Sequence, residues 1–469
     1  MLAVAAVFCA LGAQSQASNP SSAQNPYFGS ITVHPATDDV IQLSLDDAVS
    51  RGLANNLGLK QAEYQENAIH GQKLQALQEF LPTITLTGTT GFHQYNLEAA
   101  GFTSSFLAEL GKHFGGPVVN FPFITRATVT QGQINYNQTL FSGPVIAGWR
   151  AAGAATRAAH FTTTRARGEV VQQVATAYLH AIAAASEVDN AKALEETNRV
   201  AFNQAHEAHL AGTGSNLDEL RARVSLQTQE QAVIAAQNDF DKYQILLKRE
   251  IGMDPGQKIV LSDRAPYNDL ATQTPEEVRA IALKNRQDYQ GLQNTVEELR
   301  SVHAAYRSER LPTLSFGGNY GVTTIGSVGS HGTFQAVGTL SFPIFREARL
   351  RGDIQASQAQ LDAANAQLDD LRGKIDQQVR SALLDVDATA KLVEVSRSNV
   401  ELATRALSDE TDRVNAGVDD TLPLVTAQAT LANAQTRLVE SLYQYNLSKL
   451  ALARASGVLE QQYRVYLGR

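Results

Sequence analysis

The sequence predicts a fold in which long α-helices are combined with a transmembrane β-barrel. Three observations lead to this prediction: an internal duplication, short alternating stretches at matching points of both copies, and long helical segments with apolar stripes. Each copy is expected to contain a helix, two strands, a long helix and a further helix. The helices would form long coiled-coil-like hairpins, and each chain would contribute four strands to the barrel.

The duplication aligns residues 45–91 with residues 275–321 without a gap, at an offset of about 230. The clearest matching segments are Leu81-Pro82-Thr83 in the first copy and Leu311-Pro312-Thr313 in the second. The following region also repeats, at an offset of about 205, because Gln172-Gln173-Val174 recurs as Gln377-Gln378-Val379. Two offsets in one order indicate a repeated structural unit.

We therefore expect a first repeat at 41–273 and a second repeat with a C-terminal tail at 274–469. The change of offset places about 25 extra residues between the two strands of the first copy. Residues 1–17 are expected to be a signal peptide, since an apolar run precedes the small-x-small site Ser15-Gln16-Ala17. Residues 18–40 are rich in Ser, Asn, Gln and Pro and are expected to be a flexible leader. Cys9, the one cysteine, would leave with the signal peptide, so no disulfide or thiolate metal site is expected.

The first helix is expected to begin with a capping box at Ser44 and Asp47 and to run without interruption to Phe80. Pro82 then ends it, and from Thr83 the pattern changes to a period of two. Threonines occupy one face of this strand, and Ile84 and Leu86 occupy the other.

An insertion is expected at 91–125, with a short helix formed around Phe106, Leu107, Leu110 and Phe114. The second strand is expected at 126–141. Its apolar positions change from odd to even near Gly132, which predicts a β-bulge there.

A long helix should follow and end at Gly212, and a second helix should begin at Ser215 or Asn216 and end at Gly252. After an irregular connector the pattern repeats. The expected elements are a helix at 275–310, strands at 313–322 and 333–345 with a turn near Gly329, a long helix to Gly417, and a last helix from about 421 to 456.

The long helix of the second copy carries an apolar stripe whose members are three or four positions apart. This spacing is typical of coiled-coil packing rather than of a cofactor site. The stripe consists of Leu361, Ala364, Leu368, Leu371, Ile375, Val379, Ala382 and Val386.

Beyond the N-terminus, no apolar run reaches the roughly 18 residues that a membrane-spanning helix needs. If the chain crosses a membrane, a closed barrel must do it, because an open sheet edge in lipid leaves backbone groups without partners. Four strands are too few to enclose a channel. Three chains would supply twelve strands, so we expect a homotrimer with a 12-stranded barrel in contact with lipid.

Composition and motifs exclude several function classes. A net charge of −8, with 39 basic residues and no basic cluster, argues against nucleic acid as a partner. His206-Glu207-Ala208-His209 lacks the spacing of zinc enzymes and is interpreted as a solvated helix face. Gly212-Thr213-Gly214 lacks a third glycine and a preceding strand, so it is interpreted as a turn rather than a nucleotide loop. No catalytic constellation is recognisable, and we expect no enzyme activity, no cofactor and no metal site.

The duplicated order of elements resembles the TolC family of outer-membrane efflux proteins over roughly residues 43–457. Besides the two Leu-Pro-Thr motifs, the resemblance rests on residues 140–143, 211–218 and 416–422. It implies a trimeric channel in the outer membrane, with a helical tunnel in the periplasm. It also implies a passive export duct of a tripartite efflux or type I secretion system, with a periplasmic adaptor protein and an inner-membrane transporter as partners.

The hairpin tips are the candidate sites. By resemblance and position, Gly212 and Leu217 of the first tip, and Gly417 and Leu422 of the second, are expected to dock the adaptor. Three carboxylates near the tips are candidates for the tunnel's entrance constriction, although capping of the following helix is an alternative role for the last two. They are Asp218, Asp419 and Asp420. In the second copy, Pro423 and Thr426 stand where many family members carry acidic residues.

The main alternative function is a structural or adhesive coiled-coil protein of the cell envelope. It would explain the helices and the signal peptide. It would not explain alternating strands at matching points of both copies.

Overall fold

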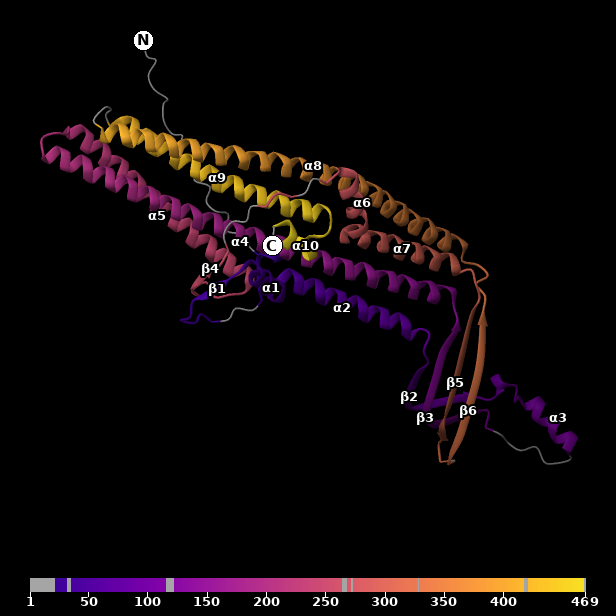
Figure 1. Cartoon of the computed structure of the whole chain (residues 1–469). Coiled ribbons are helices and arrows are strands. Elements are labelled where there is room, and N and C mark those ends of the chain that lie inside the picture. Colours follow the sequence, from indigo (N-terminus) through magenta and orange to yellow (C-terminus); the bar gives the residue numbers. More distant parts are fainter. Residues whose placement is uncertain are drawn as a thin grey trace, which may run out of the picture. The chain divides into compact units, whose positions relative to one another are not determined.

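The computed structural model describes residues 22–31, 35–114, 122–263, 268–270, 273–327, 329–416 and 421–467. The chain divides into two compact units, whose helices and strands are labelled in Figure 1. Unit 1 comprises the described residues within 1–67, 158–293 and 366–469, and unit 2 those within 68–157 and 294–365. Both units take residues from both predicted repeats. The repeat boundaries themselves stay a prediction.

Unit 2 contains a four-stranded antiparallel sheet in the order β2-β3-β5-β6. Its strands are β2 (Thr83–Asn96), β3 (Ile124–Phe141), β5 (Thr313–Ile325) and β6 (Ser330–Ser341). The period of two therefore predicted all four strands. The turn between β5 and β6 contains Gly326 and Gly329, both with positive φ.

Three strand details differ from expectation. β2 continues to Asn96, so the insertion is shorter than 91–125, but it does contain the expected helix, α3 (Ser104–Phe114). The predicted bulge at Gly132 is wrong, because Gly132 pairs regularly with Gly88 and Val322. The register instead shifts at Leu140, which lies unpaired between Thr139 and Phe141. On β3, the apolar residues therefore change from one face of the strand to the other near Gly132, while the backbone pairing there stays regular.

The end of β6 was also wrongly placed. Its pairing stops at Ser341, opposite Thr313, although the apolar alternation continues to Phe345. Pro343 has no amide hydrogen to donate to a neighbouring strand, which explains why the ladder ends before it.

The first helix of each repeat is broken, contrary to the prediction of continuous helices. In the first repeat the break falls at Asn56, between α1 (Leu45–Asn55) and α2 (Leu57–Gln78). In the second it falls at Arg286, between α6 (Pro275–Asn285) and α7 (Gln287–Ser308). Asn56 has extended backbone angles, and its side-chain oxygen accepts the Leu59 amide at 3.1 Å, as an N-cap does.

The long helices agree closely with the sequence pattern. They are α4 (Gly143–Leu210), α5 (Asn216–Ile251), α8 (Glu347–Asn415) and α9 (Thr421–Ala455). Six of the eight stripe residues on α8 are buried, and Ile375 and Val379 are completely so. The apolar stripe is therefore a packing surface. Among the described residues, no helix has a stretch long and apolar enough to cross a membrane.

Unit 1 contains short elements that the sequence analysis missed. β1 (Ile41–Leu43) pairs in parallel with β4 (Ile259–Leu261). The Tyr178 hydroxyl lies 2.9 Å from the Leu43 carbonyl oxygen and 2.8 Å from an Asp263 carboxylate oxygen, which ties this pair of strands to α4. Three residues are too few to show a period.

Two terminal segments are tied to the same unit. Within the leader, the 3₁₀ turn η1 (Pro26–Phe28) lies beside the Asn56 break, since the Asn56 side-chain Nδ2 donates to the Tyr27 carbonyl at 2.7 Å. After α9, the helix α10 (Leu459–Tyr466) returns to the first repeat. There, the Tyr463 hydroxyl donates to Asp46 at 2.7 Å.

Candidate functional site

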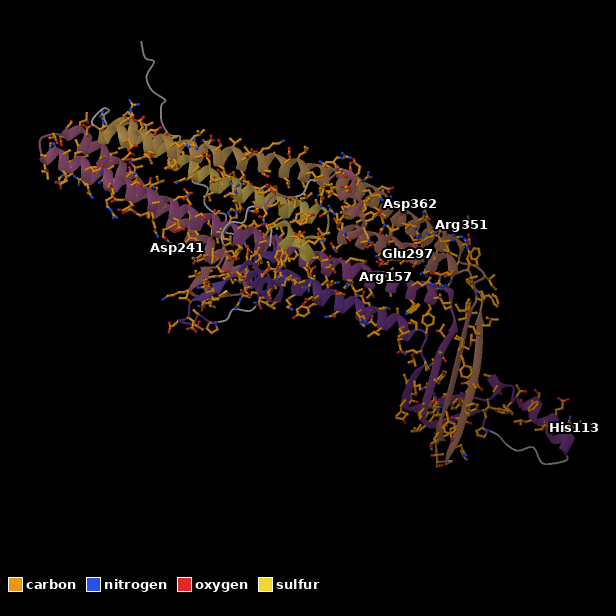
Figure 2. All side chains as sticks on the ribbon, viewed as in Figure 1. His113, Arg157, Asp241, Glu297, Arg351 and Asp362 are labelled. Carbon is orange, nitrogen blue, oxygen red and sulfur yellow. The ribbon has the colours of Figure 1, made fainter. Side chains whose placement is uncertain are left out.

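In the half next to the helices, the sheet of unit 2 has one polar and one apolar face, as its alternation predicts. One row of the apolar face joins Leu86, Ile134, Tyr320 and Phe334 across all four strands. The solvent-exposed fractions of these residues are 80% for Leu86, 51% for Ile134, 65% for Tyr320 and 76% for Phe334. Apolar side chains exposed in one continuous layer are the pattern expected of a surface that faces lipid. Figure 2 draws the side chains on this ribbon.

The opposite face carries Thr83, Thr85, Thr87 and Thr89 of β2, together with asparagine and glutamine side chains of β3, β5 and β6. On β3 and β5 these residues are mostly half-buried, whereas Phe316, Tyr320 and Val322 on the other face of β5 are exposed. The polar face is therefore the more enclosed of the two. Near the helices it borders a hollow of about 280 Å³, whose lining includes Thr83, Asn137 and Ser315.

The sheet has two open edges within the chain. β2 pairs only with β3, and β6 pairs only with β5, among the strands that the structure describes. Each outer strand therefore presents backbone donors and acceptors that need another partner. A partner strand or water can satisfy them, but lipid cannot.

The tip between α4 and α5 is tightly turned. The amides of Thr213 and Gly214 both donate to the Ala208 carbonyl at 2.9 Å, and Gly212 has φ +70°. This left-handed conformation confirms the expected glycine at the end of the helix. A Cβ atom built on Gly212 meets nothing within 4 Å, so the position faces open space.

Ser215 begins α5, because its hydroxyl accepts the Leu217 amide at 3.1 Å. Leu217 is 53% exposed and is followed by exposed Leu220 and Val224. Leu220 and Val224 border an apolar groove of about 510 Å³, which Val425 of α9 also lines. The described tip thus presents apolar side chains close to its turn.

The carboxylate Asp218 is half-buried and lies 3.5 Å from the Arg221 guanidinium of the next helical turn. Its neighbour Glu219 lies 2.9 Å from His206 and 3.9 Å from His209 on α4. The His-Glu-Ala-His segment therefore contacts the facing helix α5 and helps to close the hairpin, rather than lying on a purely solvated face. Within the described residues, no cluster of three or more metal-ligating side chains is found.

The second tip is only partly observed. Gly417, Asp419 and Asp420 lie outside the described residues. For Leu422 the structure describes only its helical backbone, at the start of α9. The roles predicted for these four residues stay predictions.

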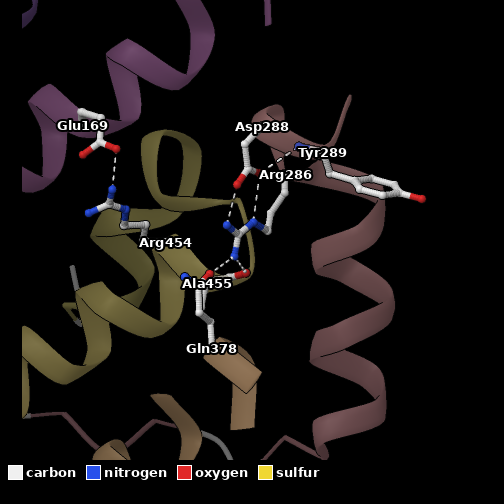
Figure 3. A network of polar contacts seen from close by, with 7 residues as sticks. All are labelled: Glu169, Arg286, Asp288, Tyr289, Gln378, Arg454 and Ala455. Atoms are coloured by element: carbon white, nitrogen blue, oxygen red, sulfur yellow. Dashed lines mark hydrogen bonds and ion pairs between the residues drawn. The ribbon is translucent and has the colours of Figure 1, made fainter. Parts of the chain in front are cut away.

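A polar network around Arg286 was not anticipated from the sequence (Figure 3). The Arg286 guanidinium donates to both carboxylate oxygens of Asp288, at 3.0 and 2.6 Å, and to the Gln378 side chain at 2.6 Å. Burial alone would raise the pKa of Asp288, but hydrogen bonds and charge from Arg286 hold this pKa below its ordinary value.

The end of α9 contacts Arg286 within the second repeat and Glu169 of the first repeat. Arg286 lies 3.5 Å from the Ala455 carbonyl at the end of α9, and Arg454 of α9 forms an ion pair with Glu169 of α4. The sequence held one indication of the break at Arg286, which is its position. Arg286 lies 230 residues after Asn56, and this distance equals the offset between the two repeats. Neither residue is a helix breaker by type, so composition did not reveal the break.

Two further titratable side chains, Glu250 and Lys449, are fully buried in unit 1. Burial raises the pKa of the Glu250 carboxyl to about 8, even though the Gln173 amide donates to it at 3.1 Å. Burial also lowers the pKa of the Lys449 ammonium to about 8. Lys449 donates to the Asn268 carbonyl at 3.3 Å and lies 4.5 Å from the Tyr445 ring centre.

Comparisons with known proteins agree with this geometry. The Outer membrane efflux protein family matches residues 48–253 and 278–458. The chain is 25% identical over 272 residues to Outer membrane efflux protein BepC of Brucella suis biovar 1 (strain 1330), covering 56% of this chain and 59% of that protein. It is 21% identical over 357 residues to Outer membrane protein TolC of Escherichia coli (strain K12), covering 72% and 71%.

Among solved structures, a membrane protein from Pseudomonas aeruginosa superposes with a TM-score of 0.74 at 20% identity. That superposition covers 88% of this chain and 93% of the other. At this identity, the similarity establishes the fold.

Proposed function

The chain belongs to the outer membrane efflux protein family and is thus an outer-membrane protein with a helical portion in the periplasm. We propose that it is a passive export duct. In this proposal it connects a periplasmic adaptor protein and an inner-membrane transporter to the cell exterior. The assembly would be a tripartite efflux system or a type I secretion system. The duct would perform no chemistry of its own.

The observation that carries the proposal is the four-stranded sheet with two different faces and two open edges. Three copies would pair β6 of one chain with β2 of the next, which would satisfy both edges and close twelve strands. The row of Leu86, Ile134, Tyr320 and Phe334 would then face lipid, and the polar face would line the lumen.

The hairpin tips supply the proposed contact with the adaptor. Gly212 allows the chain to turn at positive φ, and exposed Leu217 follows five residues later. Leu220, one helical turn after Leu217, borders the apolar groove between α5 and α9. We assign the same role to Gly417 and Leu422 in the second copy. An apolar, tightly turned tip suits an adaptor that presents apolar side chains of its own.

The entrance constriction is proposed to contain Asp419 and Asp420, repeated three times around the axis. Rings of carboxylates attract cations in narrow pores. Asp218 contributes less charge in this proposal, since Arg221 lies beside it. Replacing Asp419 and Asp420 with Asn retains helix capping but removes the charge. Loss of cation selectivity and of divalent-ion block in single-channel recordings would support the ring, whereas unchanged values would leave the pair as caps only.

Channel formation can be tested directly in planar lipid bilayers. The purified protein should insert and give discrete conductance steps, because its lumen would connect the two compartments. A structural or adhesive coiled-coil protein of the envelope, which is the alternative, would give none. Heat-modified migration of the detergent-extracted protein on a gel provides a second, independent readout of a stable oligomeric barrel.

A further inference from the structure

A groove of about 540 Å³ lies between α7 and α8 in unit 2, beside the end of the sheet. Its lining includes three arginines, Arg307, Arg310 and Arg351, together with half-buried His303. Among its described lining residues, the single carboxylate is Asp362, which lies about three helical turns beyond Arg351 and away from the strands. Figure 2 labels Arg351 and Asp362 on α8. The end of the groove next to the sheet is therefore positively charged.

The arginines at this end are only partly neutralised. Arg310 and Arg351 both donate to the same carboxylate oxygen of Glu347, at 2.9 and 2.7 Å. Arg307 is exposed and forms no ion pair among the residues that the structure describes. Of the three guanidinium groups, two share one carboxylate and the third has none. Guanidinium groups suit phosphate as a partner, because each can donate two parallel hydrogen bonds to it.

The groove opens on the exposed side of α7. One side of this helix carries residues that are all exposed, namely Glu297, Arg300, Ala304 and Arg307. The opposite side carries residues that are all half-buried, namely Glu298, Val302, Tyr306 and Glu309. Leu311, four residues after Arg307, continues the exposed side toward β5, whose own exposed side is the apolar one. The groove therefore lies on the same side of unit 2 as the exposed apolar row of the sheet.

The first repeat lacks these arginines. At the gapless offset of 230 residues, Arg307 and Arg310 correspond to Leu77 and Phe80. A helix that leads into a strand of this sheet therefore does not need arginine at these positions. The cluster was not visible in the sequence, because about 40 residues separate Arg310 from Arg351 and only the fold brings them together.

We propose that the groove between α7 and α8 binds the phosphate group of an anionic phospholipid in the periplasmic leaflet of the outer membrane. The helical portion lies in the periplasm, so the end of the sheet next to the helices lies at that leaflet. Arg310 is three residues before β5, and arginines directly beside a membrane segment attract anionic headgroups. The inference rests on the proposed barrel for one point, that the exposed face of the sheet is its lipid-facing side.

Apolar side chains on the sheet side of the groove suit the acyl chains of such a lipid. Exposed Leu311 precedes β5, exposed Phe316 lies within it, and exposed Phe342 directly follows β6. A phospholipid would use both the arginines and these apolar residues, whereas inorganic phosphate would use the arginines alone. The continuity of charged and apolar surface therefore favours a lipid over a soluble anion.

Lipid binding can be counted on the purified protein in detergent by mass spectrometry of the intact complex. The probe is an equimolar mixture of phosphatidylglycerol and phosphatidylcholine with the same acyl chains. The native protein should retain several-fold more phosphatidylglycerol, because its headgroup carries a net negative charge and that of phosphatidylcholine does not. Equal retention of the two lipids would overturn the proposal.

Arg307→Gln combined with Arg351→Gln should reduce the retained phosphatidylglycerol several-fold, since Arg310 stays paired with Glu347. The matched control, Arg300→Gln with Arg405→Gln, also removes two positive charges, but from exposed ion pairs outside the groove. This control should retain phosphatidylglycerol as the native protein does. Native retention by the first variant, or equal losses in the two, would contradict binding in the groove.

Two further measurements keep the result decisive. If the double variant does not assemble, Arg307→Gln alone should still retain markedly less phosphatidylglycerol, and full retention would overturn the proposal. A large excess of inorganic phosphate should displace little of the lipid from the native protein, and complete displacement would mean a site for soluble anions instead. Lipid retention without conductance steps would support this site and contradict the export duct alone.

Discussion

Asn56 and Arg286 occupy equivalent positions of the two repeats, and each is the single residue between two helices. Their backbone angles are nearly the same, with φ −64° and ψ 130° at Asn56 and φ −68° and ψ 120° at Arg286. Their side chains reach different partners. Asn56 bonds to the leader at Tyr27, whereas Arg286 bonds to Asp288, Gln378 and the end of α9. Both repeats therefore contain the helix break at the same position, but different side-chain partners stabilise it in each repeat.

Replacing Arg286 with Ala should destabilise unit 1 by roughly 2–3 kcal/mol, because a nearly buried guanidinium with charge-assisted hydrogen bonds is lost and Asp288 is left without its cation. Thermal unfolding followed by circular dichroism measures the effect. The control Arg300→Ala removes an exposed pair with Glu297 and should change stability by less than about 1 kcal/mol. Equal effects of the two substitutions would mean that the network does not hold the break.

The buried Glu250 carboxyl should make stability depend on pH. Its pKa is about 8 in the folded chain against 4.5 for the ordinary group, so between these values the folded chain keeps a proton that the unfolded chain has released. This contribution to stability is fully present below about pH 4.5 and is lost as the pH rises toward 8.

Glu250→Gln should therefore raise the unfolding temperature at pH 8 by at least about 3 °C and flatten its dependence between pH 5 and pH 8. The Gln side chain still offers an oxygen to the Gln173 amide. Glu230→Gln, at an exposed position of the same helix, provides the control and should leave the pH profile as it is. A native-like profile in the Glu250→Gln protein would contradict the assignment.

The sequence predicted the long elements because their periods are long enough to be unambiguous. The stripe from Leu361 to Val386 and the alternation from Thr83 to Thr87 both correspond to observed faces. Helix caps at Ser44, Ser215 and Gly252 were also predicted correctly, since capping depends on local chemistry.

The missed features depend on contacts between distant segments. The break at Arg286 is accompanied by partners up to 169 positions away, at Ala455, and no local residue signals it. The three-residue strands β1 and β4 pair across about 218 positions, and their period is too short to detect. The strand ends at Asn96 and Ser341 were misplaced in opposite directions. Backbone pairing continues beyond the clear alternation in β2 and stops before the end of the alternation in β6.

The tip glycine provides a test of adaptor docking. Gly212→Trp should abolish export while leaving the protein assembled in the outer membrane, because the position faces open space and a bulky side chain there would obstruct a partner rather than the fold. Positive φ at this residue costs an ordinary side chain about 1–2 kcal/mol, so the matched control is Gly212→Asn, which tolerates this conformation. Export by the native host and the amount of assembled protein are measured together. Full export by the Gly212→Trp variant would exclude the tip from docking.

The central claim is that three copies of this chain close one barrel. The most direct measurement is the mass of the protein extracted from the outer membrane in detergent, determined by light scattering with correction for bound detergent. The open edges of β2 and β6 predict a particle with three times the protein mass of one chain. A stable monomer that keeps its sheet would contradict the account.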